Sequence, residues 1–257
     1  MEEQKFTKIP EVKEKKPYIL MENNVGIHNS DLEATRTRLL KGNSYKDLST
    51  IIIVPTRGMI PAPWVQAYGA LMKAMNSKCT TLFCSGDEVG ISYNNAINMI
   101  LENKELSTWK YILTYEDDVI PPPDGLLKLY EHIGNYNALS AAYFSKGISG
   151  NFQAYGNPNV HPKNFLPQVP IPDSITEVNA LGMGFVLMPL SNFSKMREAM
   201  NTTVYFKTVQ EWNPNEGSKM LTQDIYFYEQ GGKLGFRYAV DTHIKCAHFD
   251  SNENIYW

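Results

Sequence analysis

Three consecutive acidic residues, Glu116, Asp117 and Asp118, follow the apolar run at 111–113 and precede a proline-rich turn. The apolar run predicts a buried parallel strand, and carboxylates at the carboxyl end of such a strand lie where open α/β sheets bind ligands. Three adjacent anions repel one another, and a hard divalent cation neutralises them well. Because side chains alternate along an extended chain, we expect Glu116 and Asp118 on one side and Asp117 on the other. The competing interpretation is a solvated acidic turn.

Strands and helices alternate around this triplet. The predicted strands share short β-branched or apolar runs and lie at 50–54, 80–84 and 111–115. Helical spacing predicts a helix with an apolar stripe from Trp64 to Met75, a second helix capped by Ser92, and a third from Asp124. This order predicts an α/β fold with a doubly wound parallel sheet.

Polar or small residues follow each predicted strand, at 56–58, at 85–87 and in the acidic triplet. The carboxyl ends of parallel strands meet at one edge of a sheet, so three loops should converge there, as at a nucleotide site. The first strand is not followed by a GxGxxG motif, which disfavours a dinucleotide.

The second half of the chain has a different pattern. Residues 138–175 are rich in Gly, Asn and Pro and predict a long irregular excursion of the kind that often forms binding loops. An apolar strand follows, and Gly182 and Gly184 within it predict either close backbone approach to a ligand or neighbouring chain, or a bend. A helix capped by Ser191 comes next, and another begins beside Thr222.

Composition bounds the class of protein. The chain has 257 residues, a formal net charge of −3 and three cysteines without a CxxC spacing. The charge gives no general attraction for nucleic acid or an anionic membrane, and a disulfide framework is not expected. No apolar run reaches the roughly 20 residues that span a bilayer, and the first residues lack the apolar centre of a signal peptide. We therefore expect a cytoplasmic protein without a membrane span.

Six segments, taken in order, resemble the motifs of a GT-A-type glycosyltransferase over roughly residues 50–250. They are IIIVPTRG, GISYNNAI, YILTYEDDVIPP, VNALGMGFVLM, LTQDIYFYEQGGKLGF and DTHIKCAHFD. The chain is most similar to the large inverting, family 2-like group that contains many bacterial and phage enzymes. It departs from that pattern with Glu116 in place of an Asp, Gln223 in place of an acid, and Ser92-Tyr93 where an Arg is frequent.

The resemblance implies a GT-A (Rossmann-like) fold with a mixed, mainly parallel sheet flanked by helices in a single domain at 49–257. Residues 1–48 would be an arm and lead-in segment, 49–137 the nucleotide-binding half and 138–257 the acceptor-binding half. The implied reaction moves a sugar from a nucleotide-diphosphate sugar, with UDP the favoured carrier, to a hydroxyl acceptor. Inversion is expected if Asp224 is the general base, and retention stays open.

The resemblance also implies a set of site residues. Mn²⁺ or Mg²⁺ would be held by Glu116, Asp118 and His248, with His248 as a plain core or surface histidine the alternative. The nucleotide and donor would be bound by residues of the strand ends and the following helix: Pro55, Thr56, Arg57, Asp87, Asn94, Asn95 and Asp117. The acceptor would lie against Trp212, Gly182 and Gly184, although Trp212 is equally suited to anchor a core.

Two other functions fit the same residues. A sugar nucleotidyltransferase shares the layout and the metal, but would normally carry a Gly-rich, basic loop after the first strand, which this chain lacks. A non-catalytic nucleotide- or glycan-binding protein is favoured by the changes at Glu116 and Gln223. For the acceptor, a glycan, a protein side chain, a lipid-linked sugar and a modified nucleic-acid base all stay open.

Overall fold

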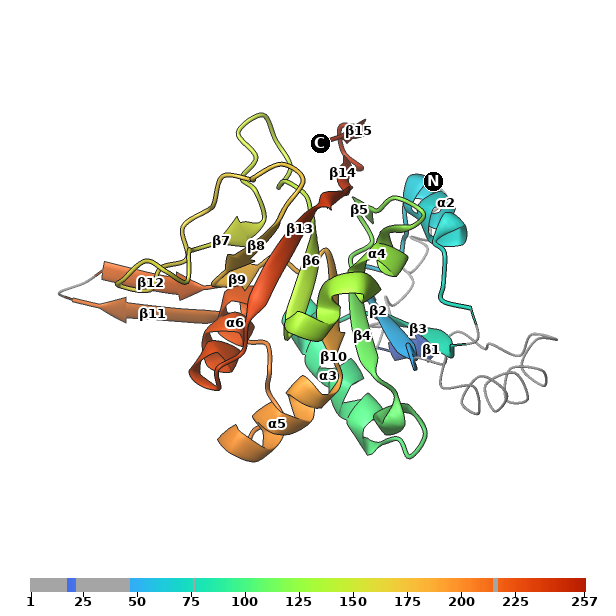
Figure 1. Ribbon diagram of the computed structural model, residues 1–257, viewed down its shortest axis with the longest axis horizontal. Coiled ribbons are helices and arrows are strands. Elements are labelled where there is room, and N and C mark those ends of the chain that lie inside the picture. The colour runs from blue at the N-terminus through green and yellow to red at the C-terminus, as the bar shows by residue number, and fades with distance from the viewer. Residues whose placement is uncertain (1–17, 22–46, 76, 215–216) are drawn as a thin grey trace, which may run out of the picture.

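The computed structural model describes residues 18–21, 47–75, 77–214 and 217–257 (Figure 1). Within this part of the chain, the main element is an eight-stranded sheet in the order β1-β3-β2-β4-β10-β6-β13-β8. Its strands, in that order, are Tyr18–Met21, Cys79–Ser85, Thr50–Thr56, Tyr111–Tyr115, Phe185–Pro189, Ala138–Ala142, Tyr238–Lys245 and Ile175–Val178.

The sheet is mixed, with parallel strands in its core. β2 runs parallel to both β3 and β4, and β13 runs parallel to β6. β10 lies between these two groups and is antiparallel to β4 and to β6. The predicted α/β class is therefore confirmed, as one domain built on a mixed sheet.

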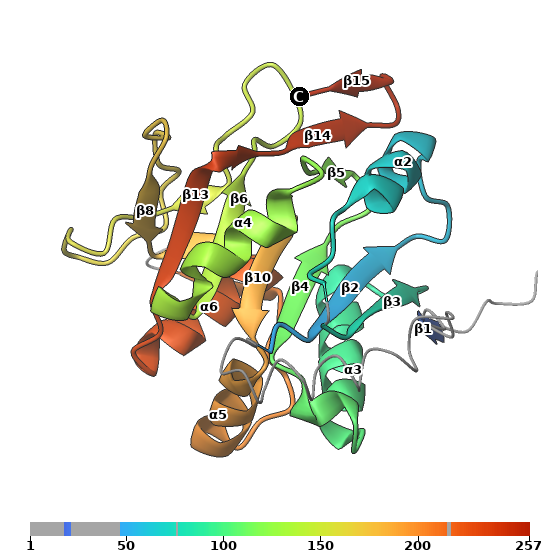
Figure 2. The same ribbon diagram turned by 45° about the vertical axis from the view of Figure 1, so that its right-hand side comes forward.

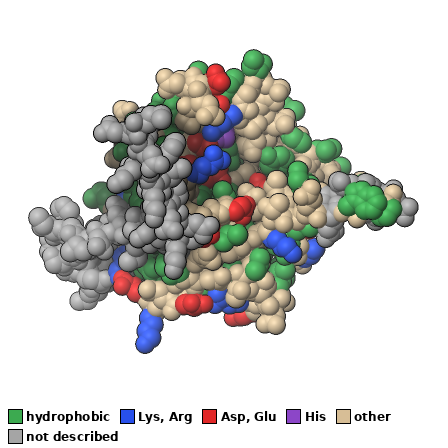
Figure 3. Space-filling view, turned by 180° about the vertical axis from the view of Figure 1, so that it is seen from behind, with side chains coloured by type: hydrophobic (Ala, Val, Ile, Leu, Met, Phe, Trp, Pro, Cys, Tyr) green, Lys and Arg blue, Asp and Glu red, His purple; other side chains and the backbone are tan. Residues whose placement is uncertain are grey.

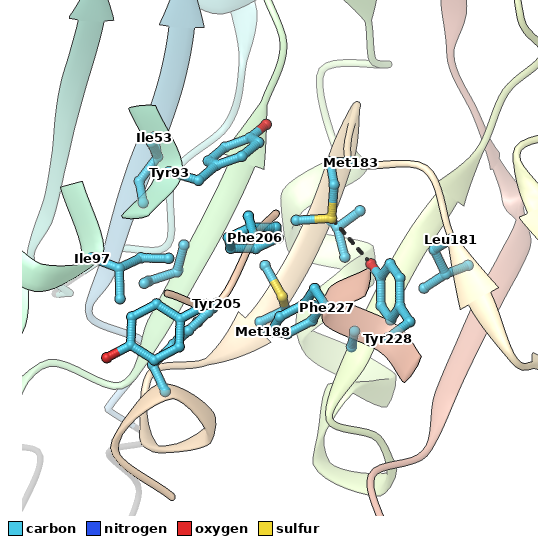
Figure 4. Close-up of a cluster of buried hydrophobic side chains, with 14 of the residues drawn as sticks. Ile53, Tyr93, Ile97, Leu181, Met183, Met188, Tyr205, Phe206, Phe227 and Tyr228 are labelled. Carbon is cyan, nitrogen blue, oxygen red and sulfur yellow. Dashed lines mark hydrogen bonds between the residues drawn. The ribbon is translucent and has the colours of Figure 1, made fainter. Parts of the chain in front are cut away.

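Both faces of the sheet are covered by helices, as the apolar run of β2 requires. Ile51 and Ile53 point into one cluster and Ile52 and Val54 into the other, all with 0% exposure. The first cluster contains side chains from α3 (Val89–Glu102), α5 (Ser191–Met200) and α6 (Gln223–Lys233), partly drawn in Figure 4. The second contains side chains from α2 (Ala62–Ala70) and α4 (Gly125–His132).

Smaller elements complete the described chain. They are η1 (Leu106–Thr108), η2 (Ile133–Asn135), β5 (Val119–Ile120), β7 (Ala154–Tyr155), β9 (Ala180–Leu181), β11 (Val209–Asn213), β12 (Gly217–Leu221), β14 (Ala247–Asp250) and β15 (Ile255–Tyr256). Figure 2 shows β14 passing from the end of β13 toward β5 and α2, across the carboxyl ends of the central strands. β14 pairs with β5, with His248 opposite Val119. The last strands are thereby placed against the acidic triplet. No helix of the described residues is both long and apolar enough to cross a membrane.

The largest difference from the sequence prediction is β6, which lies inside the segment expected to be irregular. Its sequence, Ala-Leu-Ser-Ala-Ala, has little β-propensity, yet all five residues are buried between β10 and β13. Tertiary packing favours small side chains at this position, and a local pattern cannot show that.

Helix boundaries also differ. α3 begins at Val89 with Glu88 as its N-cap, whose carboxylate accepts a hydrogen bond from the Ile91 backbone, so Ser92 lies inside the helix and does not cap it. α2 ends at Ala70, which leaves Met75 87% exposed instead of on a buried stripe. Leu190 is the N-cap of α5, and Ser191 is its first residue. Most of the predicted arm at 1–48 lies outside the described residues.

Candidate active site

The acidic triplet lies in a turn and not on an extended strand. β4 ends at Tyr115, and the Glu116 backbone N–H donates to the Gly184 carbonyl at 3.0 Å. The Val119 N–H then donates back to the Glu116 carbonyl at 3.2 Å, which closes a tight turn over Asp117 and Asp118. The predicted alternation, with Glu116 and Asp118 on one side, is wrong because a turn rotates successive side chains differently from a strand. The three carboxylates consequently meet three different environments.

Asp118 faces two basic side chains. Its Oδ2 accepts a hydrogen bond from the Lys146 ammonium at 2.6 Å and lies 3.2 Å from His248 Nε2. Burial alone would raise the pKa of the Asp118 carboxyl, but the hydrogen bonds and charges of His248 and Lys146 outweigh burial and lower the pKa. Asp118 is therefore held as an anion.

Glu116 lies near the charges of Asp118, Asp224 and Asp117 and near the Tyr93 hydroxyl. Burial raises the pKa of Glu116 to about 8, and the charges of Asp118, Asp224 and Asp117 add to the shift. The Tyr93 hydroxyl approaches closely enough to oppose this shift in pKa, but it makes no hydrogen bond of ordinary geometry. In Figure 4 the Tyr93 ring borders the apolar cluster and its hydroxyl points out of it.

Asp117 points toward the end of β2. Burial raises the pKa of its carboxyl, the Thr56 hydroxyl opposes that shift, and the charge of Asp118 adds to it. The charges of Lys146 and Arg57 also oppose the rise in the pKa of Asp117, which stays above its ordinary value. Asp117 thus joins the acidic turn to the first of the three predicted loops.

A cleft of about 550 Å³ lies at this edge of the sheet. Seven of the residues predicted from the sequence line it: Pro55, Thr56, Arg57, Asp87, Glu116, Asp117 and Asp118. Figure 3 shows acidic side chains in a hollow of the molecular surface, with basic and histidine side chains beside them. The loops after β2, β3 and β4 converge as expected.

Lys146, Ser251 and Asn252 also line the cleft, and sequence reasoning did not identify them. Lys146 is a lone lysine in an irregular segment, without a motif around it. Its proximity to Asp118 depends on how residues 143–152 fold, which no local pattern specifies.

The two candidate asparagines lie inside α3, and not at its start as predicted, and they have different surroundings. Asn95 Nδ2 donates to Asp87 Oδ2 at 3.1 Å and so orients a carboxylate that lines the cleft. Asn94 is not among the residues that line the cleft. Its Oδ1 accepts from the backbone of Tyr205 at 2.8 Å and of Phe206 at 3.0 Å, and its Nδ2 donates to the Phe206 carbonyl at 2.7 Å. Asn94 fastens the 205–206 segment to α3.

Asp224 lies in the first turn of α6, behind Glu116. Its Oδ1 accepts hydrogen bonds from the Thr222 hydroxyl and from the Ile225 N–H at 2.9 Å, which fix the orientation of the carboxyl. Burial raises the pKa of Asp224, although these hydrogen bonds oppose the shift. A Cβ added at Gly90 of α3 would lie 3.0 Å from the Gln223 Cβ, so the first turns of α3 and α6 meet here.

The three predicted acceptor residues are not gathered in one place. The Gly184 N–H donates to the Tyr143 hydroxyl at 2.8 Å, and a Cβ at Gly184 would lie 2.7 Å from the Tyr143 ring. The close approach that Gly182 and Gly184 allow is therefore to the protein's own Tyr143, which also packs edge-on against His248. Trp212 is on the β11–β12 hairpin and is 72% exposed, which excludes it as a core anchor.

The side chains around Asp118 fit a divalent cation with two protein ligands. His248 Nδ1 donates to the Phe144 carbonyl at 2.9 Å, which turns Nε2 toward Asp118 Oδ2. A metal-bound histidine is usually oriented in this way by a carbonyl behind it. Within the described residues, no group of three His, Cys, Asp or Glu side chains is arranged to hold a metal. Glu116 thus does not join Asp118 and His248.

A larger hollow, of about 710 Å³, lies at the other end of the central strands, beside Tyr111 and Pro189. Its described lining is rich in Ser and Asn and includes two lysines, Lys110 and Lys195, but no carboxylate or imidazole. The chemistry is therefore concentrated at the smaller cleft.

Comparison with known proteins supports the class of fold. No family model matches the chain, and no curated protein matches it. Solved structures do match: the fold resembles that of A197 from STIV, with a TM-score of 0.53 over 81% of this chain and 92% of that one. Sequence identity in this alignment is 15%, so the likeness shows the fold alone.

Proposed function

We propose that this chain is a GT-A-type glycosyltransferase that transfers a sugar from a nucleotide-diphosphate sugar to a hydroxyl acceptor. One observation carries the proposal: three loops at the carboxyl ends of β2, β3 and β4 form a cleft lined by Asp118, and the Asp118 carboxylate is paired with His248. Open α/β sheets bind nucleotides at this edge. A carboxylate beside an imidazole suits a divalent cation, with Mn²⁺ favoured over Mg²⁺ by the nitrogen.

Asp118 and His248 would hold the cation. When bound, it would supply Lewis-acid stabilisation of the charge that develops on the leaving diphosphate, an effect worth several kcal/mol. Glu116 would stay outside this set, because within the described residues no three His, Cys, Asp or Glu side chains are arranged around one metal position.

The nucleoside would lie against the loops after β2 and β3. Asp87, oriented by Asn95, can accept a hydrogen bond from a base N–H, which suits the uracil of a UDP-sugar. The Arg57 guanidinium can stack on a base or pair with a phosphate. Asp117, held beside Thr56, lies between these groups and the acidic turn.

Asp224 would take the proton of the acceptor hydroxyl. Its carboxyl is fixed by Thr222 and Ile225, and its raised pKa makes it a stronger base than an ordinary aspartate. A base in this position would favour inversion at the anomeric carbon. Trp212 would offer an exposed aromatic face to an acceptor sugar.

The test is calorimetric titration of UDP, GDP and dTDP, each with and without Mn²⁺. We expect one nucleotide to bind in a Mn²⁺-dependent manner, and Asp118→Asn to remove the part of the affinity that depends on Mn²⁺. Asp124→Asn is the matched control, because Asp124 pairs with Lys128 on α4 and does not line the cleft. Metal-independent binding of every nucleotide, or none at all, would contradict the proposal.

A further inference from the structure

The cleft has an unbalanced set of charges for a ligand that carries a diphosphate. Its described lining contains five carboxylates, Asp87, Glu88, Glu116, Asp117 and Asp118, but only two fixed cations, Arg57 and Lys146. A diphosphate is repelled by the ionised carboxylates among them and attracted by the two cations. A basic side chain that can leave its carboxylate partner and contact the phosphates would therefore strengthen binding of the diphosphate.

Lys146 already has such a partner. Its Nζ lies 2.6 Å from Asp118 Oδ2, the same oxygen that lies 3.2 Å from His248 Nε2. An ion bound by Asp118 and His248 would sit about 2 Å from its ligand atoms. Two positive charges on one oxygen at such distances repel strongly, so an ion at this oxygen and the Lys146 ammonium are alternatives.

The loop that carries Lys146 is tightly built and also holds His248. The Ser145 N–H donates to the Asn151 carbonyl at 2.9 Å, the Asn151 N–H donates to the Ser145 hydroxyl at 2.8 Å, and Phe144 packs on Phe152. The Phe144 carbonyl is the partner of His248 Nδ1. One loop therefore positions both basic groups that face Asp118. The Lys146 side chain keeps 32% exposure, so its ammonium can change direction without disturbing the core.

We propose that Lys146 is a diphosphate-binding residue that exchanges partners, bound to Asp118 in the free protein and to the donor's diphosphate once a divalent cation takes Asp118. The identity of the ligand in this inference rests on the proposed function. The competition between Lys146 and a cation for Asp118 does not depend on that function. The exchange keeps Asp118 neutralised in both states. It also delivers a second positive charge to the phosphates at the moment when the cation arrives.

The test measures binding and not turnover, using Lys146→Ala, Lys146→Arg and, as a charge-matched control, Lys233→Ala, which removes an exposed lysine of α6. Three probes are titrated into each protein: Mn²⁺ alone, inorganic pyrophosphate with Mn²⁺, and UDP with Mn²⁺. We expect Lys146→Ala to bind Mn²⁺ alone about tenfold more tightly, because its competitor at Asp118 is gone. The same variant should bind pyrophosphate and UDP about ten- to hundredfold more weakly, the usual effect of losing one charge-assisted hydrogen bond.

Opposite changes for Mn²⁺ and for pyrophosphate would support the exchange, with Lys146→Arg keeping most of the phosphate affinity and Lys233→Ala behaving as wild type. Unchanged Mn²⁺ affinity in Lys146→Ala, or unchanged pyrophosphate affinity, would overturn it. If the wild type binds pyrophosphate through Lys146 but no nucleotide, the exchange stands and the nucleotide-sugar function fails. If UDP binds equally to wild type and Lys146→Ala, the function stands and the exchange fails.

Discussion

Acidic residues of the same motif differ in pKa because their neighbouring side chains and their burial differ. Asp118 and Glu116 are both acids at the end of β4, two positions apart, yet one faces Lys146 and His248 and the other faces Tyr93. The pKa is consequently lowered at Asp118 and raised to about 8 at Glu116. Neighbouring charges and burial therefore assign different chemical roles within one motif.

Asp224 gives a residue-scale prediction about both activity and stability. In Asp224→Asn, sugar transfer should fall by about 10²- to 10⁴-fold, because an amide cannot take the acceptor proton. In the wild type, transfer should be lost as pH falls through the raised pKa of Asp224. A pH–rate profile of each protein measures both effects.

The same raised pKa fixes the sign of a stability change. Between the ordinary pKa of an aspartate and the raised pKa of Asp224, the folded protein keeps a proton that the unfolded chain has lost, so the wild type loses stability as pH rises through this window. Asp224→Asn lacks this loss and should be more stable than the wild type at pH 7. The difference in the free energy of unfolding between the two proteins should shrink as the pH falls. Urea unfolding at several pH values measures it. A variant that loses activity and is also less stable at pH 7 would indicate that Asp224 only caps α6.

The elements that could be predicted are those whose local sequence pattern allows only one kind of secondary structure. The β-branched run of β2 is buried on both faces, and such a run has few alternatives to a central strand. β6 could not be predicted, because Ala and Ser gain their place only from the packing of β10 and β13 around them. The acidic residues of the cleft could be predicted because they follow a strand with a clear local pattern. Lys146 was missed because its position depends on tertiary packing.

The loop at 143–152 gives a prediction at this scale. A Cβ at Gly150 would fall on the Ser145 carbonyl oxygen, so Gly150→Ala must open the loop that holds Lys146 and His248. We expect about tenfold or greater loss of pyrophosphate affinity in the presence of Mn²⁺, as for removal of a charge-assisted hydrogen bond. Thermal stability should change little, because residues 144–151 lie outside both core clusters, with Ile148 at the tip of the loop 99% exposed.

Gly134→Ala is the control for this variant. A Cβ at Gly134 meets nothing within 4 Å, so the substitution changes the backbone's freedom without a clash. If both glycine variants bind pyrophosphate as the wild type does, the loop is not what positions the cleft's basic groups.

At the scale of the whole molecule, one continuous sheet joins the two halves of the site. β10, from the second half of the chain, pairs directly with β4, with Leu187 opposite Leu113. The loops after β2, β3 and β4 and the Gly182–Gly184 segment therefore cannot separate without breaking a ladder of backbone hydrogen bonds. Such a frame suits group transfer, which needs two substrates held in a fixed relation.

The most direct test of the glycosyltransferase assignment is to follow a panel of UDP-sugars by proton NMR with the protein and Mn²⁺, with water as the acceptor. We expect slow release of UDP together with the free sugar, first seen as the inverted anomer, and loss of this release in Asp118→Asn. Formation of a sugar 1-phosphate together with UMP would contradict the assignment, because it requires attack of water at phosphorus. Formation of a sugar 1-phosphate together with UTP when pyrophosphate is added would indicate a nucleotidyltransferase. Absence of any Mn²⁺-dependent turnover across the panel would contradict the glycosyltransferase assignment as well and favour a binding protein.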